Sequence, residues 1–190
     1  GDVTEEDAFR LAEETYGRVD ANPAIRPRSR PPGPLHAAPD RVRLADQRVR
    51  QPGLHRVAIV PSYRTAAPGI AEAHDILAHI AGARPNGRIY QALVTEKGLA
   101  VTAGAYYEGS ALGEGRIGVY ASPRPGVTLE QLDAALAVET GRIAANGLTE
   151  DEFARARNRL IAESIYAQDS QAAMARMYGS SITCGATIAD

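Results

Sequence analysis

The stretch from Asn86 to Tyr107, NGRIYQALVTEKGLAVTAGAYY, constrains the fold more than any other part of the chain. It begins with a helix-breaking Asn-Gly pair and continues with residues at a helical spacing of four: Ile89, Leu93 and Lys97. Gly98 interrupts this pattern, and residues typical of a strand follow. A helix that passes its chain directly to a strand has to lie across the sheet that contains the strand. The sequence therefore predicts an α+β fold in which this joint sets how the layers stack.

The bulk composition limits the classes of partner. A chain of 190 residues, 44% apolar and 23% charged, is long enough for one domain with its own core. Its 21 basic and 23 acidic side chains give a net charge of -2, which disfavours nucleic acid and anionic membranes as partners. One cysteine, Cys184, excludes an internal disulfide framework and a cysteine-rich zinc cluster. No apolar run approaches the roughly 20 residues of a membrane span, so we expect none.

The first 40 residues predict a short helix and then a linker. Thr4 is a candidate N-cap, and an amphipathic run with acidic residues in its first turn ends at Gly17. Six prolines follow between Pro23 and Pro39, and proline interrupts both helices and sheet ladders. We expect residues 20–40 to form an extended linker, with a proline-rich ligand for a recognition module as the alternative. Because GDVTEEDAF has neither an initiator methionine nor a basic signal sequence, we expect the chain to be a piece of a longer protein.

The rest of the chain alternates between strand and helix patterns. Strands are expected at residues 41–50, 54–63, 99–108 and 116–122. Helices are expected at residues 69–81, from 128 to 146, and from 149 to 178 with a break near Asp169. The apolar run within 54–63 predicts a central strand buried on both faces. The last two strands, joined by a glycine-rich connection, predict an antiparallel pair.

Two histidines of the helix expected at 69–81 are candidate metal ligands. Zinc-binding helices place two histidines four apart, in HExxH or the inverted HxxEH, so that both rings project from one face. His74 and His79 are five apart, which rotates the second ring by about 140°. Neither zinc motif occurs in the 190 residues. We therefore interpret both as surface or boundary histidines.

Three further patterns also have simpler interpretations than ligand binding. The connection at 109–115 lacks the GKS or GKT ending of a phosphate loop. Tyr106 and Tyr107 alternate along one strand, so only one of them can face a cleft. Arginines of the last long helix suggest an anion site, but their acidic neighbours are typical of a solvated face: Arg155, Arg157 and Arg159. The sequence thus assigns no catalytic, cofactor-binding or metal-binding residue to this chain.

Several stretches resemble the second domain of a half-molecule of the M16 metallopeptidases, the family of pitrilysin, insulin-degrading enzyme and mitochondrial processing peptidase. They are GDVTEEDAFRLAEETYGRV at 1–19, PSYR at 61–64, RIYQALVTEKGLA at 88–100 and GLTEDEFARARNRLIAE at 147–163. The resemblance implies a helix at 1–19 that closes a preceding domain, an interdomain linker at 20–40 and the second domain at 41–190. It also implies a two-layer α+β sandwich of the LuxS and processing-peptidase type, in which helices cover one face of a mixed, antiparallel-rich sheet.

The resemblance further implies a bacterial-type zinc peptidase as the parent protein. Zinc would be bound in the preceding domain by the inverted motif, where a glutamate activates the metal-bound water for attack on a peptide carbonyl. This chain would supply chamber wall, substrate contact and pairing with a second M16 half or homologous subunit. The substrate would be a peptide or unfolded polypeptide. The compartment would be the periplasm if the parent has a signal peptide, and the cytoplasm otherwise.

One departure from the family pattern divides the functional hypotheses. Active halves of the opposite wall carry an arginine and a tyrosine seven residues apart that stabilise the oxyanion, and the matching positions here are Val94 and Val101. Aliphatic side chains donate no hydrogen bond, so either the partner half supplies this function or the chain belongs to a non-catalytic structural or assembly subunit. An unrelated α+β binding module is the third alternative.

Overall fold

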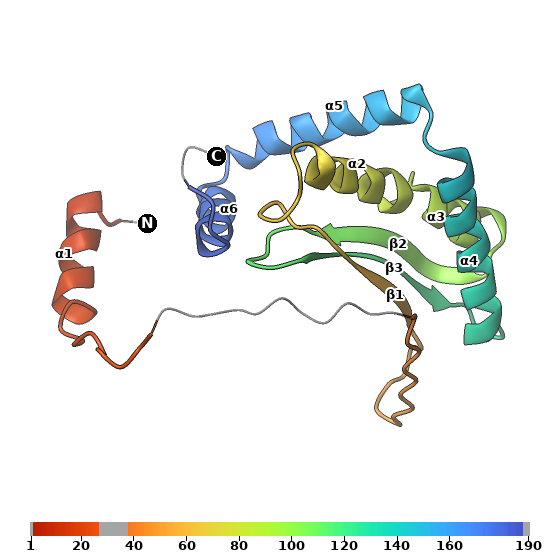
Figure 1. Cartoon of the computed structure of the whole chain (residues 1–190), viewed down its shortest axis with the longest axis horizontal. Coiled ribbons are helices and arrows are strands. Elements are labelled where there is room, and N and C mark those ends of the chain that lie inside the picture. Colours follow the sequence, from red (N-terminus) through yellow and green to blue (C-terminus); the bar gives the residue numbers. More distant parts are fainter. Residues whose placement is uncertain (1, 27–37, 188–190) are drawn as a thin grey trace. The chain divides into compact units, whose positions relative to one another are not determined.

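A computed structural model of the chain describes residues 2–26 and 38–187 (Figure 1). The chain divides into two compact units, Gly1–His36 and Ala37–Asp190. The first unit contains helix α1 (Glu5–Thr15), whose N-cap Thr4 accepts a hydrogen bond from the Asp7 amide at 3.1 Å. No residue of α1 is buried, so its apolar side chains pack into no core among residues 2–26. Residues 27–37 of the expected linker lie outside the described residues.

The second unit is built on an antiparallel sheet of three strands within the part of the chain that the structure describes. These are β1 (Leu54–Val60), β2 (Ala100–Glu108) and β3 (Gly115–Pro123), in the order β1-β3-β2. The pairing of β2 with β3 confirms the antiparallel pair predicted from the glycine-rich connection. The described sheet is antiparallel throughout, not mixed.

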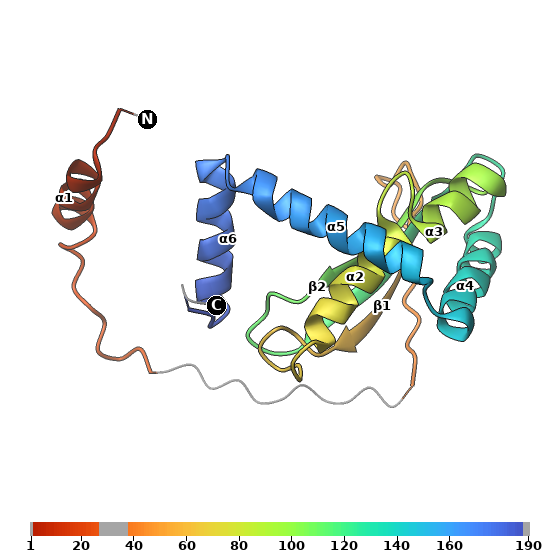
Figure 2. The same cartoon turned by 90° about the horizontal axis from the view of Figure 1, so that it is seen from above.

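Helices cover one face of this sheet. Helix α2 (Ile70–Gly82) lies on β2, and α5 (Glu150–Ala167) crosses the outer side of α2 (Figures 1 and 2). Helix α4 (Leu129–Asn146) stands at the end of the sheet, and α6 (Gln171–Thr183) follows α5. The predicted α+β architecture with helices on one face is therefore confirmed. No helix among residues 2–26 and 38–187 is long and apolar enough to cross a membrane.

The core lies where the helix-to-strand joint meets α4. Four large side chains there are completely or almost completely buried: Ile89, Leu93, Leu132 and Leu136. The sheet contributes small residues to the same cluster: Ala100, Ala103 and Ala121. A flat alanine surface lets the helices approach closely, and each fully buried leucine or isoleucine contributes roughly 1.5–3 kcal/mol to stability. The stretch at residues 86–107, which most constrains the fold, thus also contributes the centre of the core.

Both long C-terminal helices begin at complete capping boxes. The Thr128 side chain accepts from the Gln131 amide while the Gln131 side chain accepts from the Thr128 amide. Thr149 and Glu152 repeat the arrangement at the start of α5. Between the two helices Gly147 adopts a φ of 65°, which ends α4 at the expected position.

The joint after the Asn-Gly pair is not an ordinary α-helix. A short α-helical segment, α3 (Arg88–Tyr90), continues as a π-helix, η1 (Gln91–Glu96). The Lys97 amide donates to the Ala92 carbonyl, five residues back, at 3.1 Å. The predicted helix, turn and strand are therefore present, with a wider hydrogen-bonding pattern than the spacing of four indicates.

Two strand predictions are wrong. Residues 41–50 form no strand, and Val42 is 92% exposed. Its neighbours Arg41 and Arg43 turn instead toward acidic residues of α4, which leaves the apolar positions facing solvent. The strand within 54–63 is β1, and it lies at an edge of the described sheet, not at its centre.

Candidate functional site

A row of aromatic rings crosses the sheet on the face away from the helices. Tyr120 of β3 pairs in register with His55 of β1 on one side and with Gly104 of β2 on the other. The rings of His55 and Tyr120 stack at 6.1 Å, and those of Tyr120 and Tyr106 lie 6.5 Å apart. We call His55, Tyr120 and Tyr106 the aromatic row. It spans all three described strands.

Two glycines make this row possible. A Cβ at Gly104 would lie 2.7 Å from the Tyr120 hydroxyl oxygen, and a Cβ at Gly118 would overlap the Tyr106 ring. The tyrosines therefore lie flat across strand positions that have no side chain. Val57 and Ile59 of β1, both more than half exposed, extend the same face. An open surface of this kind suits apolar and stacking contacts with a polypeptide.

The helix side of the sheet holds a second group of aromatic side chains. Tyr107 donates to the Pro61 carbonyl at 2.6 Å, and its ring lies 5.2 Å from that of His74 on α2. The Tyr63 hydroxyl donates to the Asp75 carboxylate. Burial raises the pKa of both tyrosines, and the hydrogen bond to Asp75 raises the pKa of Tyr63 further. Both phenols therefore stay protonated and act as hydrogen-bond donors.

The prediction that Tyr106 and Tyr107 occupy opposite faces of one strand is confirmed. Tyr106 belongs to the aromatic row, whereas Tyr107 packs against α2. The sequence did not indicate which of the two would remain on an open face. That depends on which face the helices cover, and on the pairing of β3 with both neighbours.

The two candidate histidine ligands do not meet. His74 faces Tyr107, and its Nδ1 is buried without a hydrogen-bond partner among the described residues. His79 lines a cavity between α2 and α5. Among residues 2–26 and 38–187, no three histidine, cysteine, aspartate or glutamate side chains converge on one point. The two histidines of α2 therefore do not fit a zinc site.

Val94 and Val101, which the resemblance aligns with the family's arginine and tyrosine, lie on either side of a glycine turn. Val94 packs against the core, whereas Val101 on β2 is 46% exposed. Gly98 between them adopts a φ of 61°. The guanidinium of Arg124 donates to the carbonyl of Ala100 at 3.2 Å and to that of Val94 at 3.4 Å. This arginine fixes the turn through backbone carbonyls.

Comparison with known proteins gives a consistent result for family and fold. The family model described as the peptidase M16 inactive domain matches residues 1–160. No curated protein matches the chain. A protease from Helicobacter pylori is 17% identical with a TM-score of 0.73, and the match covers 95% of this chain and 44% of that one. The chain thus spans less than half of that relative.

Two further solved structures share the fold. An inactive peptidase domain from Bordetella parapertussis, whose parent is named as a candidate zinc protease, is 20% identical with a TM-score of 0.61. That match covers 72% of each chain. A peptidase M16 inactive domain from Pseudomonas fluorescens is 16% identical with a TM-score of 0.58, over 87% of this chain and 38% of that one. At these identities the likeness establishes the fold alone.

Proposed function

Because the chain belongs to the peptidase M16 inactive-domain family, we propose that it is the second domain of one half of a zinc-dependent peptidase. The zinc site would lie in a preceding domain of the parent protein. Two findings support this assignment: the chain spans 44% of the Helicobacter protease, and the Bordetella relative comes from a candidate zinc protease. This domain would bind substrate and pair with a second M16 half, while peptide hydrolysis takes place at the zinc site of the parent.

The aromatic row is the observation that carries the proposed contact with substrate. Three rings and two exposed aliphatic side chains lie on a sheet face that no helix among residues 38–187 covers. Aromatic side chains bury large areas and lose little conformational entropy on binding, so a row of them favours an unfolded polypeptide. This face would form part of a chamber wall.

The proposed pairing with a second M16 half rests on the identity of Val94 and Val101. Neither aliphatic side chain can donate to a developing oxyanion, a contribution worth about 10²–10³ in kcat. A partner with donors at the matching positions would supply it. We therefore propose a heterodimer of two M16 subunits as the active species.

The decisive experiment measures zinc content and peptide hydrolysis of the full-length parent, alone and mixed with its co-expressed homologue. One zinc per parent chain, with activity only in the mixture, is the expected result. In that mixture, Tyr106→Ser together with Tyr120→Ser should raise KM about tenfold with little change in kcat. Tyr166→Ser, on the exposed surface of α5, is the matched control and should leave KM unchanged.

A non-catalytic assembly subunit is the second candidate, because the same two valines are also expected in a scaffold that has lost the activity. It predicts a stable complex with the homologue, no zinc in the parent and no hydrolysis in the mixture. That combination of results would overturn the peptidase assignment. The family membership of the chain would stand.

A further inference from the structure

A cavity of about 250 Å³ opens between the end of α2, the loop at residues 83–87 and the second turn of α5. Its apolar floor is made of small and medium side chains: Ile80, Ala83 and Ala156. Polar side chains make up the rest of the wall: His79, Asn86, Glu152, Arg155 and Arg159. The cavity is separate from the aromatic row, which lies on the other face of the sheet.

Two of the charged side chains in this wall are already neutralised. Glu152 is bound by Arg88 through two hydrogen bonds and also serves the capping box of α5. Arg159 donates to Glu163 at 2.9 Å. These groups therefore contribute little net charge to the cavity.

The other three polar side chains have no such partners. His79, Asn86 and Arg155 form no side-chain hydrogen bond or ion pair with any residue in the ranges 2–26 and 38–187. One guanidinium, one amide and one imidazole therefore line the same cavity without partners among the described residues. The cavity has an excess of hydrogen-bond donors and the uncompensated charge of one arginine.

We propose that this cavity binds a carboxylate group of a peptide, with Arg155 as the counter-charge and Asn86 and His79 as additional donors. A planar guanidinium matches a carboxylate in a two-bond geometry that a point charge cannot reproduce. The small floor admits one short side chain beside the carboxylate. The choice of a peptide ligand rests on the proposed function, whereas the preference for a carboxylate rests on the cavity alone.

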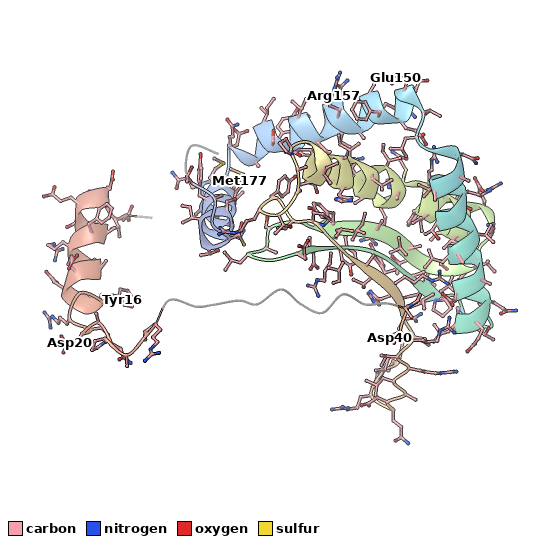
Figure 3. All side chains as sticks on the ribbon, in the orientation of Figure 1. Tyr16, Asp20, Asp40, Glu150, Arg157 and Met177 are labelled. Carbon is pink, nitrogen blue, oxygen red and sulfur yellow. The ribbon has the colours of Figure 1, made fainter. Side chains whose placement is uncertain are left out.

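This assignment separates Arg155 from the neighbouring arginines of α5, which the sequence presents as one solvated set. Arg157 does not line the cavity, and Figure 3 shows it on the side of α5 that faces away from α2. Arg159 has its own carboxylate partner. Of these three arginines, only Arg155 both lines the cavity and has no ion-pair partner among the described residues.

The test uses the 190-residue chain and three blocked dipeptides, observed by NMR chemical-shift titration. N-acetyl-Ala-Ala carries a terminal carboxylate, its C-terminal amide carries none, and N-acetyl-Ala-Glu-amide carries only a side-chain carboxylate. We expect saturable shifts at the amides of Ala83, Gly87 and Ala156 with at least one carboxylate peptide, and none with the uncharged amide. Which of the two carboxylate peptides binds more tightly identifies the source of the group.

The matched variants are Arg155→Gln and Arg157→Gln, which remove the same charge from the same exposed helix. Arg155→Gln should weaken binding about tenfold or more, as expected for a charge-assisted pair, and Arg157→Gln should leave it unchanged. Asn86→Ala provides a second, independent loss of a donor and should weaken binding several-fold.

Three results would overturn the proposal: equal binding of the amide, equal loss in both arginine variants, or no saturable shift up to roughly 10 mM peptide. The titration needs neither zinc nor turnover. A failure here would therefore leave the peptidase assignment intact, and an inactive parent would leave the carboxylate site intact.

Discussion

The guanidinium of Arg88 donates two hydrogen bonds to the carboxylate of Glu152, which lies 64 residues further along the chain. The bond from Nε to Oε1 is 2.6 Å long. A third donor of the same guanidinium reaches the Gly147 carbonyl at 3.0 Å. One side chain thus ties α3 to the turn before α5 and to the first turn of that helix. This pair lowers the pKa of Glu152 to about 2 and raises the pKa of Arg88.

Replacing Glu152 by glutamine should make stability less dependent on pH. The folded pKa of about 2 lies below the ordinary 4.5, so the ionised carboxylate stabilises the fold above about pH 5. That contribution is lost as the pH falls from 5 toward 2. We expect Glu152→Gln to cost about 1–2 kcal/mol at pH 7 in urea unfolding, after allowance for partial exposure to solvent. The cost should shrink steadily below pH 5.

Two features make this variant specific. Glutamine preserves the capping box, because Gln131 fills the same role in α4. Glu163→Gln removes an exposed partner of Arg159 and should change stability by less than about 0.5 kcal/mol at any pH. An equal cost for both variants at pH 7 would mean that the link between α3 and α5 has no special weight.

Asp133 should be the most sensitive acidic residue of α4. Its nearly buried carboxylate accepts from Arg56 Nε at 2.7 Å and from Arg41 as well. Asp133→Ala leaves two guanidinium groups without their acceptor, and we expect a loss of about 2–3 kcal/mol in chemical unfolding. Faster proteolysis within residues 41–50 should accompany it, because the ion pair between Asp133 and Arg41 holds this segment to α4.

Glu130→Gln is the control for Asp133. Glu130 pairs with Arg43, and both side chains are largely exposed, so the variant should cost less than about 0.5 kcal/mol. Unchanged proteolysis of residues 41–50 in Asp133→Ala would contradict the proposed anchoring.

Gly82 and Gly141 should respond in opposite directions to the same substitution. Alanine is the better helix former at both positions, which favours it by about 1 kcal/mol. A Cβ at Gly82, however, would overlap backbone atoms of Ala105 in β2, whereas one at Gly141 meets nothing within 4 Å. Thermal unfolding should show Gly82→Ala destabilised by about 2–3 kcal/mol and Gly141→Ala stabilised by about 0.5–1 kcal/mol. A neutral Gly82→Ala would show that α2 can move away from the sheet.

Zinc should not stabilise the 190-residue chain. His74 and His79 face different neighbours, so no shared coordination sphere forms around a metal ion. We expect no saturable rise in melting temperature on titration with zinc, measured by thermal shift with the full-length parent as the positive control. A rise that saturates at one zinc per chain would require ligands that the described residues do not bring together.

Local sequence signals predicted the helices well because their boundaries depend on neighbouring residues. The predicted helix starts at residues 128 and 149 are the N-caps of α4 and α5, and the predicted break near Asp169 falls between α5 and α6. Strand positions depend on partners far along the chain. The alternation within 41–50 was therefore misleading, because its arginines find acidic partners on α4.

The candidate sites escaped the sequence for the same reason. The aromatic row joins residues from three strands, and its register follows from pairings across as many as 65 residues, such as His55 with Tyr120. Arg155 looked equivalent to Arg157 in the sequence, and only the packing of α5 on α2 separates them. The sequence did contain one signal for the row. Gly104 and Gly118 each lie opposite a tyrosine of the neighbouring strand, and the tyrosine ring covers the glycine.

The π-helical turn at Gln91–Glu96 should make this part of the chain tolerant of the loss of one residue. A π-turn holds one residue more than an α-turn, so an α-helix between the same two ends would be one residue shorter. Losing one residue here would convert the wide pattern into the ordinary one while β2 keeps its register with β3. We therefore expect a chain shortened by one residue within 91–96 to keep the sheet intact, although this joint lies at the centre of the core.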